Sequence, residues 1–144
     1  MTQPLKLRAR DGEDMQVISA MMQDAIAPVC DMAYRAADGS FVMVVQRLRR
    51  EAGKADERIC CALTISGVTA AHTHGIDLRA QDRILELLAL MLDAQDGRPS
   101  LNLIFAGGAQ IRLALGAWGA VVEDFGESWP ALCNPCHDEA VGTS

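Results

Sequence analysis

The chain lacks the features that would carry it to or through a membrane. No apolar run reaches the roughly 18 to 20 residues that a transmembrane helix needs. The longest candidate, Ile84 to Leu92, is interrupted by Glu86. The first ten residues contain neither the apolar core nor the small-residue cleavage site of a secretory leader. The sequence therefore predicts a cytoplasmic protein that does not bind membranes.

Basic residues are also few. The chain has 13 Lys and Arg residues against 19 Asp and Glu residues, for a formal net charge of −6. A negative net charge opposes binding to the phosphates of nucleic acids and of anionic lipids, so neither is an expected partner. Arg47, Arg49 and Arg50, with Arg35 nearby, form the one basic cluster. We interpret it as a solvated strand edge that discourages aggregation, although such a cluster could also bind phosphate or carboxylate.

The size of the chain predicts one domain with a core of its own. It has 144 residues, of which 50% are hydrophobic. We expect a single domain over residues 1–130 and an irregular tail over residues 131–144. Cys30, Cys60 and Cys61 lie within or beside apolar segments, where free thiols behave as small hydrophobic side chains. Unpaired thiols of this kind suit a reducing cytosol.

One short motif has a specific chemical interpretation. Cys133-x-x-Cys136-His137 matches the sequence that attaches c-type haem, but haem attachment follows export and no leader is evident. With His72 and His74, the same residues could complete a tetrahedral zinc site, because two thiolates and one or two imidazoles are typical zinc ligands. The two histidines would point the same way from a strand. A pair of histidines on a solvated face is the simpler interpretation.

The first half of the chain predicts a strand, a helix and a hairpin. Asp11 is a candidate N-cap, and the helix that follows should end near residues 25–27, before Pro28. Asp38-Gly39 between alternating apolar runs is a strong hairpin signal. Residues 58–65 alternate as a half-buried strand, and Gly67 permits a bulge.

The second half is harder to interpret. Residues 82–92 combine helix-forming residues with a continuous apolar run, so the pattern fits a helix or a buried strand. A second hairpin is expected over residues 101–115, around a turn at Gly107-Gly108. Apolar residues then recur at helical spacing from Trp118 to Phe125, which predicts a short C-terminal helix. Glu123 and Asp124 would lie near its C-terminal end, which the helix dipole disfavours, so each should either have a partner or face water.

Several segments of the chain resemble a known family. They are Val17-Ile18-Ser19-Ala20 with Gln23-Asp24-Ala25, Leu87-Leu88-Ala89, Phe105-Ala106-Gly107-Gly108, and Glu123-Asp124-Phe125-Gly126-Glu127-Ser128-Trp129-Pro130. Through these segments the chain resembles domain of unknown function family 2948, an uncharacterised proteobacterial family, and the resemblance spans nearly the whole chain. The resemblance implies no activity. It implies that Cys133 and Cys136 are peculiar to this chain, and it favours a strand over residues 82–92.

Together these elements predict an α+β fold. We expect a mostly antiparallel sheet, or a partly open barrel like that of pleckstrin-homology domains by analogy, with an N-terminal helix and a short C-terminal helix. No nucleophile, base and orienting group occur together as a recognisable set, so neither enzymatic activity nor a cofactor is expected. The leading hypothesis is a non-catalytic cytoplasmic protein that binds itself or another protein. The alternative is a zinc or redox protein that uses Cys133, Cys136 and His137.

Overall fold

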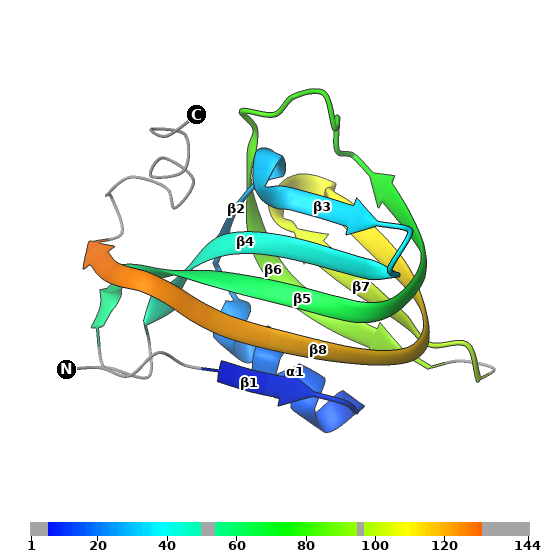
Figure 1. The fold of residues 1–144 in the computed structure, drawn as a ribbon. Coiled ribbons are helices and arrows are strands. Elements are labelled where there is room, and N and C mark those ends of the chain that lie inside the picture. Colours follow the sequence, from blue (N-terminus) through cyan, green and yellow to red (C-terminus); the bar gives the residue numbers. More distant parts are fainter. Residues whose placement is uncertain (1–5, 50–53, 95–96, 131–144) are drawn as a thin grey trace.

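The protein is a closed β-barrel. The computed structural model describes residues 6–49, 54–94 and 97–130. In this part of the chain, six antiparallel strands follow one another in the order β8-β5-β4-β2-β6-β7, and β7 pairs back onto β8 (Figure 1). Two further strands extend the sheet, since β1 pairs with β8 and β3 pairs with β4. The elements in chain order are β1 (Lys6–Ala9), α1 (Gly12–Met22), β2 (Ile26–Pro28), the 3₁₀ turn η1 (Val29–Asp31), β3 (Met32–Arg35), β4 (Ser40–Arg49), β5 (Lys54–His74), β6 (Ile84–Asp93), β7 (Ser100–Phe105), the 3₁₀ turn η4 (Ala106–Gly108) and β8 (Gln110–Pro130).

The barrel closes because β8 is long enough to pair with both β5 and β7. Strand β5 is equally long and pairs with β4 and β8. Strands β5 and β8 pair from Glu57 with Pro130 to His74 with Gln110, with register shifts that bend both strands. One bend lies at Gly67, whose φ is +75°. A Cβ atom there would lie 2.3 Å from the carbonyl oxygen of Ala117, so only glycine allows this close approach of the two backbones.

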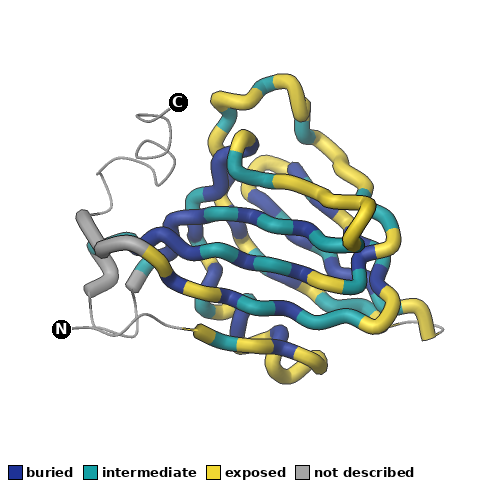
Figure 2. Tube along the Cα trace, in the orientation of Figure 1, coloured by how far each residue is buried: buried dark blue, intermediate teal, exposed yellow. Residues whose placement is uncertain are grey.

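Alternation along the strands builds the core inside the barrel. One face of each strand is buried and the other is partly or fully exposed, which appears as alternating colours in Figure 2. The residues that fill the interior come from every barrel strand, and the larger ones include Phe41, Met43, Val45, Leu63, Ile65, Leu85, Leu87, Leu101, Leu103, Phe105, Ile111, Leu113 and Val122.

Helix α1 packs against β6 and β1. Asp11 caps the helix, because its carboxylate accepts a hydrogen bond from the backbone N–H of Asp14 at 2.9 Å. The Ser19 hydroxyl oxygen accepts the backbone N–H of Leu90 on β6, also at 2.9 Å. Within the described ranges, no helix combines the length and the apolar character needed to cross a membrane.

The predicted N-cap is confirmed, but the predicted helix end is wrong. The helix stops at Met22 instead of residues 25–27. Asp24 has a φ of +69°, in the left-handed region that helical residues do not adopt, and Ile26–Pro28 joins the barrel as β2. Pairing with β4 and β6 therefore overrides the helical spacing of the apolar residues.

The predicted α+β class is also wrong. The antiparallel pairing and both hairpins are confirmed, but the barrel is closed and the described residues contain a single α-helix. The segment from Trp118 to Phe125 belongs to β8 and is not a helix. Residues 82–92, which the pattern left open, contain most of strand β6.

Candidate functional site

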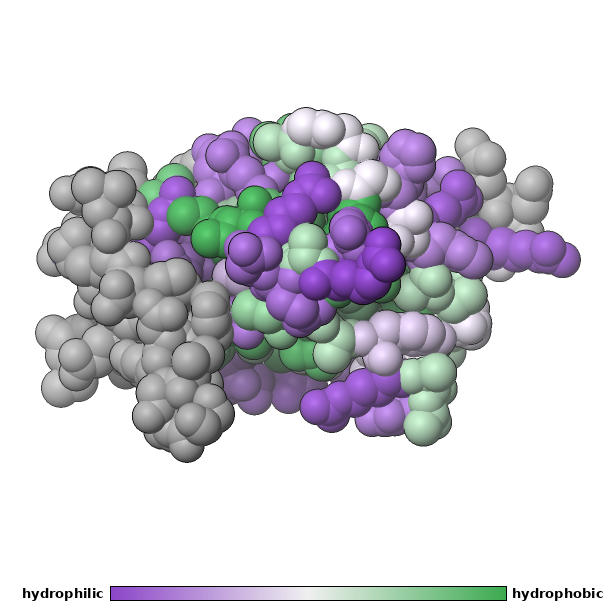
Figure 3. Space-filling model, turned by 90° about the horizontal axis from the view of Figure 1, so that it is seen from above, coloured by the Kyte–Doolittle hydropathy of each residue, from purple (hydrophilic) through white to green (hydrophobic). Residues whose placement is uncertain are grey.

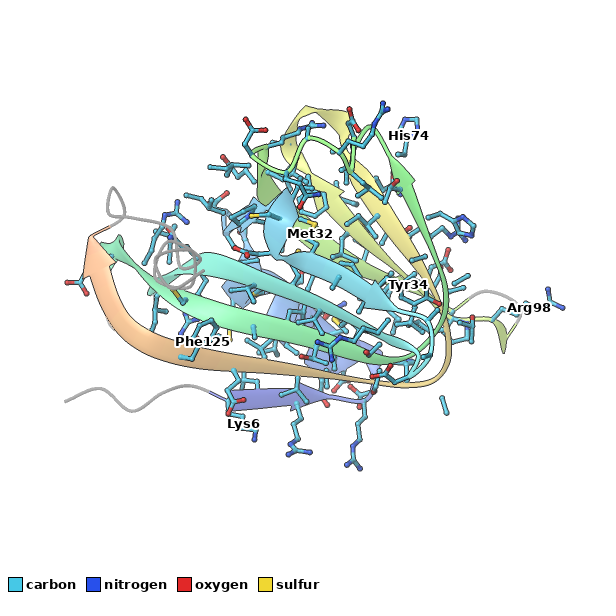
Figure 4. The ribbon with its side chains drawn as sticks, turned by 45° about the horizontal axis from the view of Figure 1, so that its top comes forward. Lys6, Met32, Tyr34, His74, Arg98 and Phe125 are labelled. Carbon is cyan, nitrogen blue, oxygen red and sulfur yellow. The ribbon has the colours of Figure 1, made fainter. Side chains whose placement is uncertain are left out.

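An apolar cleft opens at one end of the barrel, between β3 and the segment 75–83. It has a volume of about 250 Å³. Phe41 and Ile111 at its base are 4% and 2% exposed, whereas Tyr34 and Leu78 are 37% and 54% exposed. Figure 4 labels Met32 and Tyr34 on β3, and the view from above shows hydrophobic residues between hydrophilic ones (Figure 3). The full lining is Met32, Ala33, Tyr34, Phe41, Ala71, Thr73, Leu78 and Ile111.

The cleft exists because β3 has a strand partner on one side only. It pairs with β4 from Met32 with Met43 to Arg35 with Ser40. On its other side the neighbouring strand β6 begins only at Ile84, so the segment 75–83 stands where a strand would continue. In the part of the chain that the structure describes, no second strand pairs with β3. One backbone edge of β3 therefore faces the cleft without a ladder partner.

The segment 75–83 is held in shape by its own hydrogen bonds. The guanidinium of Arg83 donates to the carbonyl oxygen of Gly75 at 2.8 Å and so ties the two ends together. The carboxylate of Asp77 accepts the backbone N–H of Arg79 at 3.0 Å. Val29, the first residue of the turn η1, donates its backbone N–H to the carbonyl oxygen of Arg83 at 2.9 Å. This side of the cleft is thus formed before any ligand binds.

A buried ion pair lies elsewhere in the barrel, toward the end of β4 and β8. Nε and Nη2 of Arg47 donate to the two carboxylate oxygens of Asp124, at 2.9 Å and 2.6 Å. The two side chains are 1% and 3% exposed. Nη1 of Arg47 also donates to the carbonyl oxygen of Leu48. The expectation of a solvated Arg47 is therefore wrong. Of the two alternatives for Asp124, a partner is correct and exposure to water is not.

The cysteine at the ion pair is not an activated nucleophile. Burial raises the pKa of the Cys61 thiol to about 12, and the negative charge of Asp124 adds to the effect. Cys30 is exposed, and partial burial together with Asp31 raises the pKa of its thiol as well. Since the thiolate is the reactive form, neither free thiol is suited to nucleophilic catalysis at neutral pH.

Cys60 differs from both, because the structure holds it in a disulfide. The expectation that Cys30, Cys60 and Cys61 are all free buried thiols is thus correct for Cys61 alone. Cys60 is 2% exposed although it stands on the face of β5 opposite to Cys61 and the core. Its cross-strand neighbours are Gln46 on β4 and Phe125 on β8.

The residues of the predicted metal site are not brought together in the described structure. His72 and His74 are exposed on β5, opposite Arg112 and Gln110 of β8. The guanidinium of Arg112 across from His72 opposes a bound cation there. Among the described residues, no group of three or more His, Cys, Asp or Glu side chains could hold a metal ion. The tail ligands Cys133, Cys136 and His137 lie outside the described residues, so their metal site stays a prediction.

These features define a class of protein: an antiparallel β-barrel with one packed helix and a small apolar cleft beside an unpaired strand edge. The chain belongs to the protein family DUF2948, described as a protein of unknown function, whose model matches residues 5–137. The resemblance found in the sequence is confirmed. No curated protein matches the chain significantly.

Proposed function

We propose that the protein is a non-catalytic binding module that takes up an extended segment of another protein in the cleft between β3 and residues 75–83. The observation that carries the proposal is the unpaired edge of β3, which runs along an apolar cleft. The cytoplasm is the proposed setting, because the free thiols of Cys30 and Cys61 suit a reducing compartment; the disulfide of Cys60 is the exception to this usage.

An extended segment can use both parts of this site at once. Its backbone would add to β3 as a further strand, with hydrogen bonds to the N–H and C=O groups on the unpaired edge. Every second side chain of the segment would then point into the cleft and contact Phe41, Leu78 and Ile111. Backbone pairing supplies affinity, and the apolar contacts select the sequence.

The size of the cleft favours side chains over a cofactor or metabolite. Pockets for drug-sized ligands measure roughly 300 to 1,000 Å³. The cleft measures about 250 Å³, and its base is closed by Phe41 and Ile111. One or two apolar side chains of a peptide fit such a volume better than a larger planar ligand does.

Charge favours a different protein over a second copy of this chain. Each copy has a net charge of −6, so two copies repel one another at low ionic strength. A neutral or basic partner segment avoids the repulsion.

Selection from a displayed library of twelve-residue peptides, followed by affinity measurements on synthetic peptides, tests the proposal. We expect Leu78→Asp to weaken the selected peptides at least tenfold, because it places a charge at the rim of the cleft. Met91→Asp is the matched control: Met91 is 56% exposed and Leu78 is 54% exposed, but Met91 lies on β6 outside the cleft. This control should change affinity less than twofold.

Strand addition makes a second and sharper prediction about the peptide itself. N-methylation of its backbone should abolish binding at every second position and be tolerated at the positions between, because alternate N–H groups pair with β3. Equal binding to the Leu78 and Met91 variants, or tolerance of N-methylation throughout, would show that the cleft is not a strand-addition site. Dimers of the wild-type chain in sedimentation velocity that Leu78→Asp dissociates would instead assign the cleft to a second copy and contradict a separate protein partner.

A further inference from the structure

We propose that the outer face of the barrel binds a small organic anion, a carboxylate or a phosphate monoester attached to a planar ring. The site is a pocket of about 280 Å³ where β1, β8 and β5 lie side by side (Figure 1). We call it the arginine pocket, and its lining includes Arg8, Arg10, Ser66, Trp118, Gly119 and Val121. It is independent of peptide binding at the cleft beside β3.

Strand pairing explains why the surface is hollow at this point. Ser66 of β5 is the Cα partner of Gly119 on β8, and Val68 is the partner of Leu115. Three residues of β8, 116–118, therefore lie opposite a single residue of β5 and form a bulge. Gly119 adds no side chain beside this bulge, and a Cβ atom there would lie 3.3 Å from the hydroxyl oxygen of Ser66. The hollow thus results from a bulge and a missing side chain.

Strand β1 places two arginines at the pocket. Arg8 is the Cα partner of Val121 on β8 and is exposed, whereas the next residue, Ala9, is buried. Alternation along the chain therefore turns Arg8 and Arg10 to the same outer side, where both line the pocket. A guanidinium group binds a carboxylate or a phosphate through two parallel hydrogen bonds. Two such groups beside one pocket favour an anionic ligand.

The acidic side chains of this region are engaged elsewhere. Glu123 forms an ion pair with Lys6 at 3.7 Å. The carboxylate of Asp14 accepts the backbone N–H of Arg10 at 3.5 Å and does not pair with its guanidinium. Within the described ranges, neither Arg8 nor Arg10 forms a side-chain ion pair. The pocket therefore presents two positive charges on a chain whose net charge is −6.

The indole of Trp118 supplies a surface for a ring. One part of this side chain packs against the core, and another part lines the pocket. Because the core contact already holds the indole, a ring that stacks on it costs little further conformational entropy. The pocket is slightly smaller than the roughly 300 to 1,000 Å³ of sites for drug-sized ligands, so the ligand should be small. An anion with a single ring uses both the guanidinium groups and the indole.

Titration of the ¹⁵N-labelled full chain with phenyl phosphate, and separately with benzoate, tests the proposal. The chain has two tryptophans, so Trp129→Phe assigns the indole N–H resonance of Trp118. We expect at least one of the two anions to shift this resonance with a Kd of about 1 mM or tighter. The anion that binds more tightly identifies the acidic group. Benzyl alcohol and inorganic phosphate each carry half of the proposed ligand, so each should bind about fivefold or more weakly.

Substitutions in the pocket should weaken binding. Arg8→Gln and Arg10→Gln should each raise the Kd about fivefold or more, because each removes a charged donor. Arg112→Gln is the matched control, since Arg112 is an exposed arginine on β8 outside the pocket, and it should change the Kd less than about twofold. Gly119→Ala should also raise the Kd by filling the hollow, whereas Gly116→Ala, on the same strand outside the pocket, should not. Neither glycine has a positive φ, so alanine is compatible with both backbones.

Four results would overturn the proposal. The first is that neither anion shifts the Trp118 resonance at concentrations up to about 10 mM. The second is that Arg112→Gln weakens binding as much as Arg8→Gln does. The third and fourth are that benzyl alcohol or inorganic phosphate binds as tightly as the ring-bearing anions, which would remove either the charge or the ring from the recognition. The two arginine variants keep the test decisive even if Gly119→Ala fails to fold.

Discussion

Removing one partner of the buried ion pair should destabilise the barrel far more than removing both. Arg47 and Asp124 share two hydrogen bonds and are 1% and 3% exposed. Arg47→Met leaves the carboxylate of Asp124 buried without its cation. Asp124→Leu leaves the guanidinium of Arg47 buried without the carboxylate of Asp124. The double variant replaces the pair by two apolar side chains that can join the surrounding core.

The expected magnitudes follow from the cost of an uncompensated buried charge. Each single substitution should reduce the free energy of unfolding by about 3 to 5 kcal/mol. The double variant should lie within about 1 kcal/mol of the wild type, because no charge remains in the interior. For a chain of this size, 1 kcal/mol corresponds to about 3 °C in Tm, so each single variant should melt roughly 10 to 15 °C lower.

The residue next to Asp124 supplies a matched control. Glu123 forms an ion pair with Lys6 at 3.7 Å, and the two side chains are 56% and 50% exposed. Glu123→Gln should change the free energy of unfolding by less than about 0.5 kcal/mol, because exposed ion pairs contribute little. Urea unfolding followed by tryptophan fluorescence, with thermal melts, measures all four variants in one double-mutant cycle and its control.

Two results would refute this reasoning. If Arg47→Met costs less than about 1 kcal/mol, the Asp124 carboxylate finds other compensation and the pair is not required by burial. If the double variant is as unstable as the single variants, the loss comes from packing and not from an unpaired charge. A large effect of Glu123→Gln would show that the end of β8 is sensitive to any change of charge.

Three other predictions concern separate parts of the barrel. Gly67→Ala should lower the free energy of unfolding by about 2 kcal/mol or more, because the new Cβ would meet the carbonyl oxygen of Ala117. Gly107→Ala should lower it by only about 1 kcal/mol, since the φ of Gly107 is also positive but nothing lies within 4 Å of its Cβ position. Chemical denaturation of the two variants makes the comparison. Burial raises the pKa of the Cys61 thiol from 9.0 to about 12, so between these pH values the folded protein retains a proton that the unfolded chain loses. The free energy of unfolding should therefore fall as pH rises through that range. Cys61→Ala should reduce this fall in unfolding curves measured from pH 8 to 12. Ser19→Ala should cost about 1 to 2 kcal/mol by leaving the backbone N–H of Leu90 without its acceptor, and Ser19→Thr, which keeps a hydroxyl, should recover most of that loss in thermal melts.

Short sequence signals predict the helix start and the first hairpin correctly. Asp11 caps a helix, and Asp38-Gly39 joins two strands, because capping and turn chemistry involve only a few neighbouring residues. Alternation could also have placed Arg47. It follows Phe41, Met43 and Val45 at every second position of β4, and these three side chains point inward. The alternation along the strand therefore indicates a buried Arg47, whereas its charge alone suggests a solvated one.

Other parts of the fold depend on contacts that no local pattern reports. The bends of β8 near Gly116 and Gly119 interrupt alternation, so Trp118 to Phe125 mimics helical spacing, although pairing with β5 and β1 makes this segment a strand. The cleft has no sequence signature of its own, because β3 and the segment 75–83 become neighbours only when the barrel closes. The disulfide of Cys60 likewise depends on which parts of the chain the fold brings together.

The role of β8 as partner to three strands has a consequence for how the protein is made. It supplies the pairing for β1, for much of β5 and for one edge of β7, yet it is the last strand of the described chain to be synthesised. Lys6 on β1 is synthesised long before its partner Glu123 on β8. Until β8 is made, the edges of β1, β5 and β7 that pair with β8 in the barrel have no partner there. Pairing across such sequence distances is slow and leaves strand edges exposed to aggregation. The barrel therefore cannot close until β8 has been synthesised.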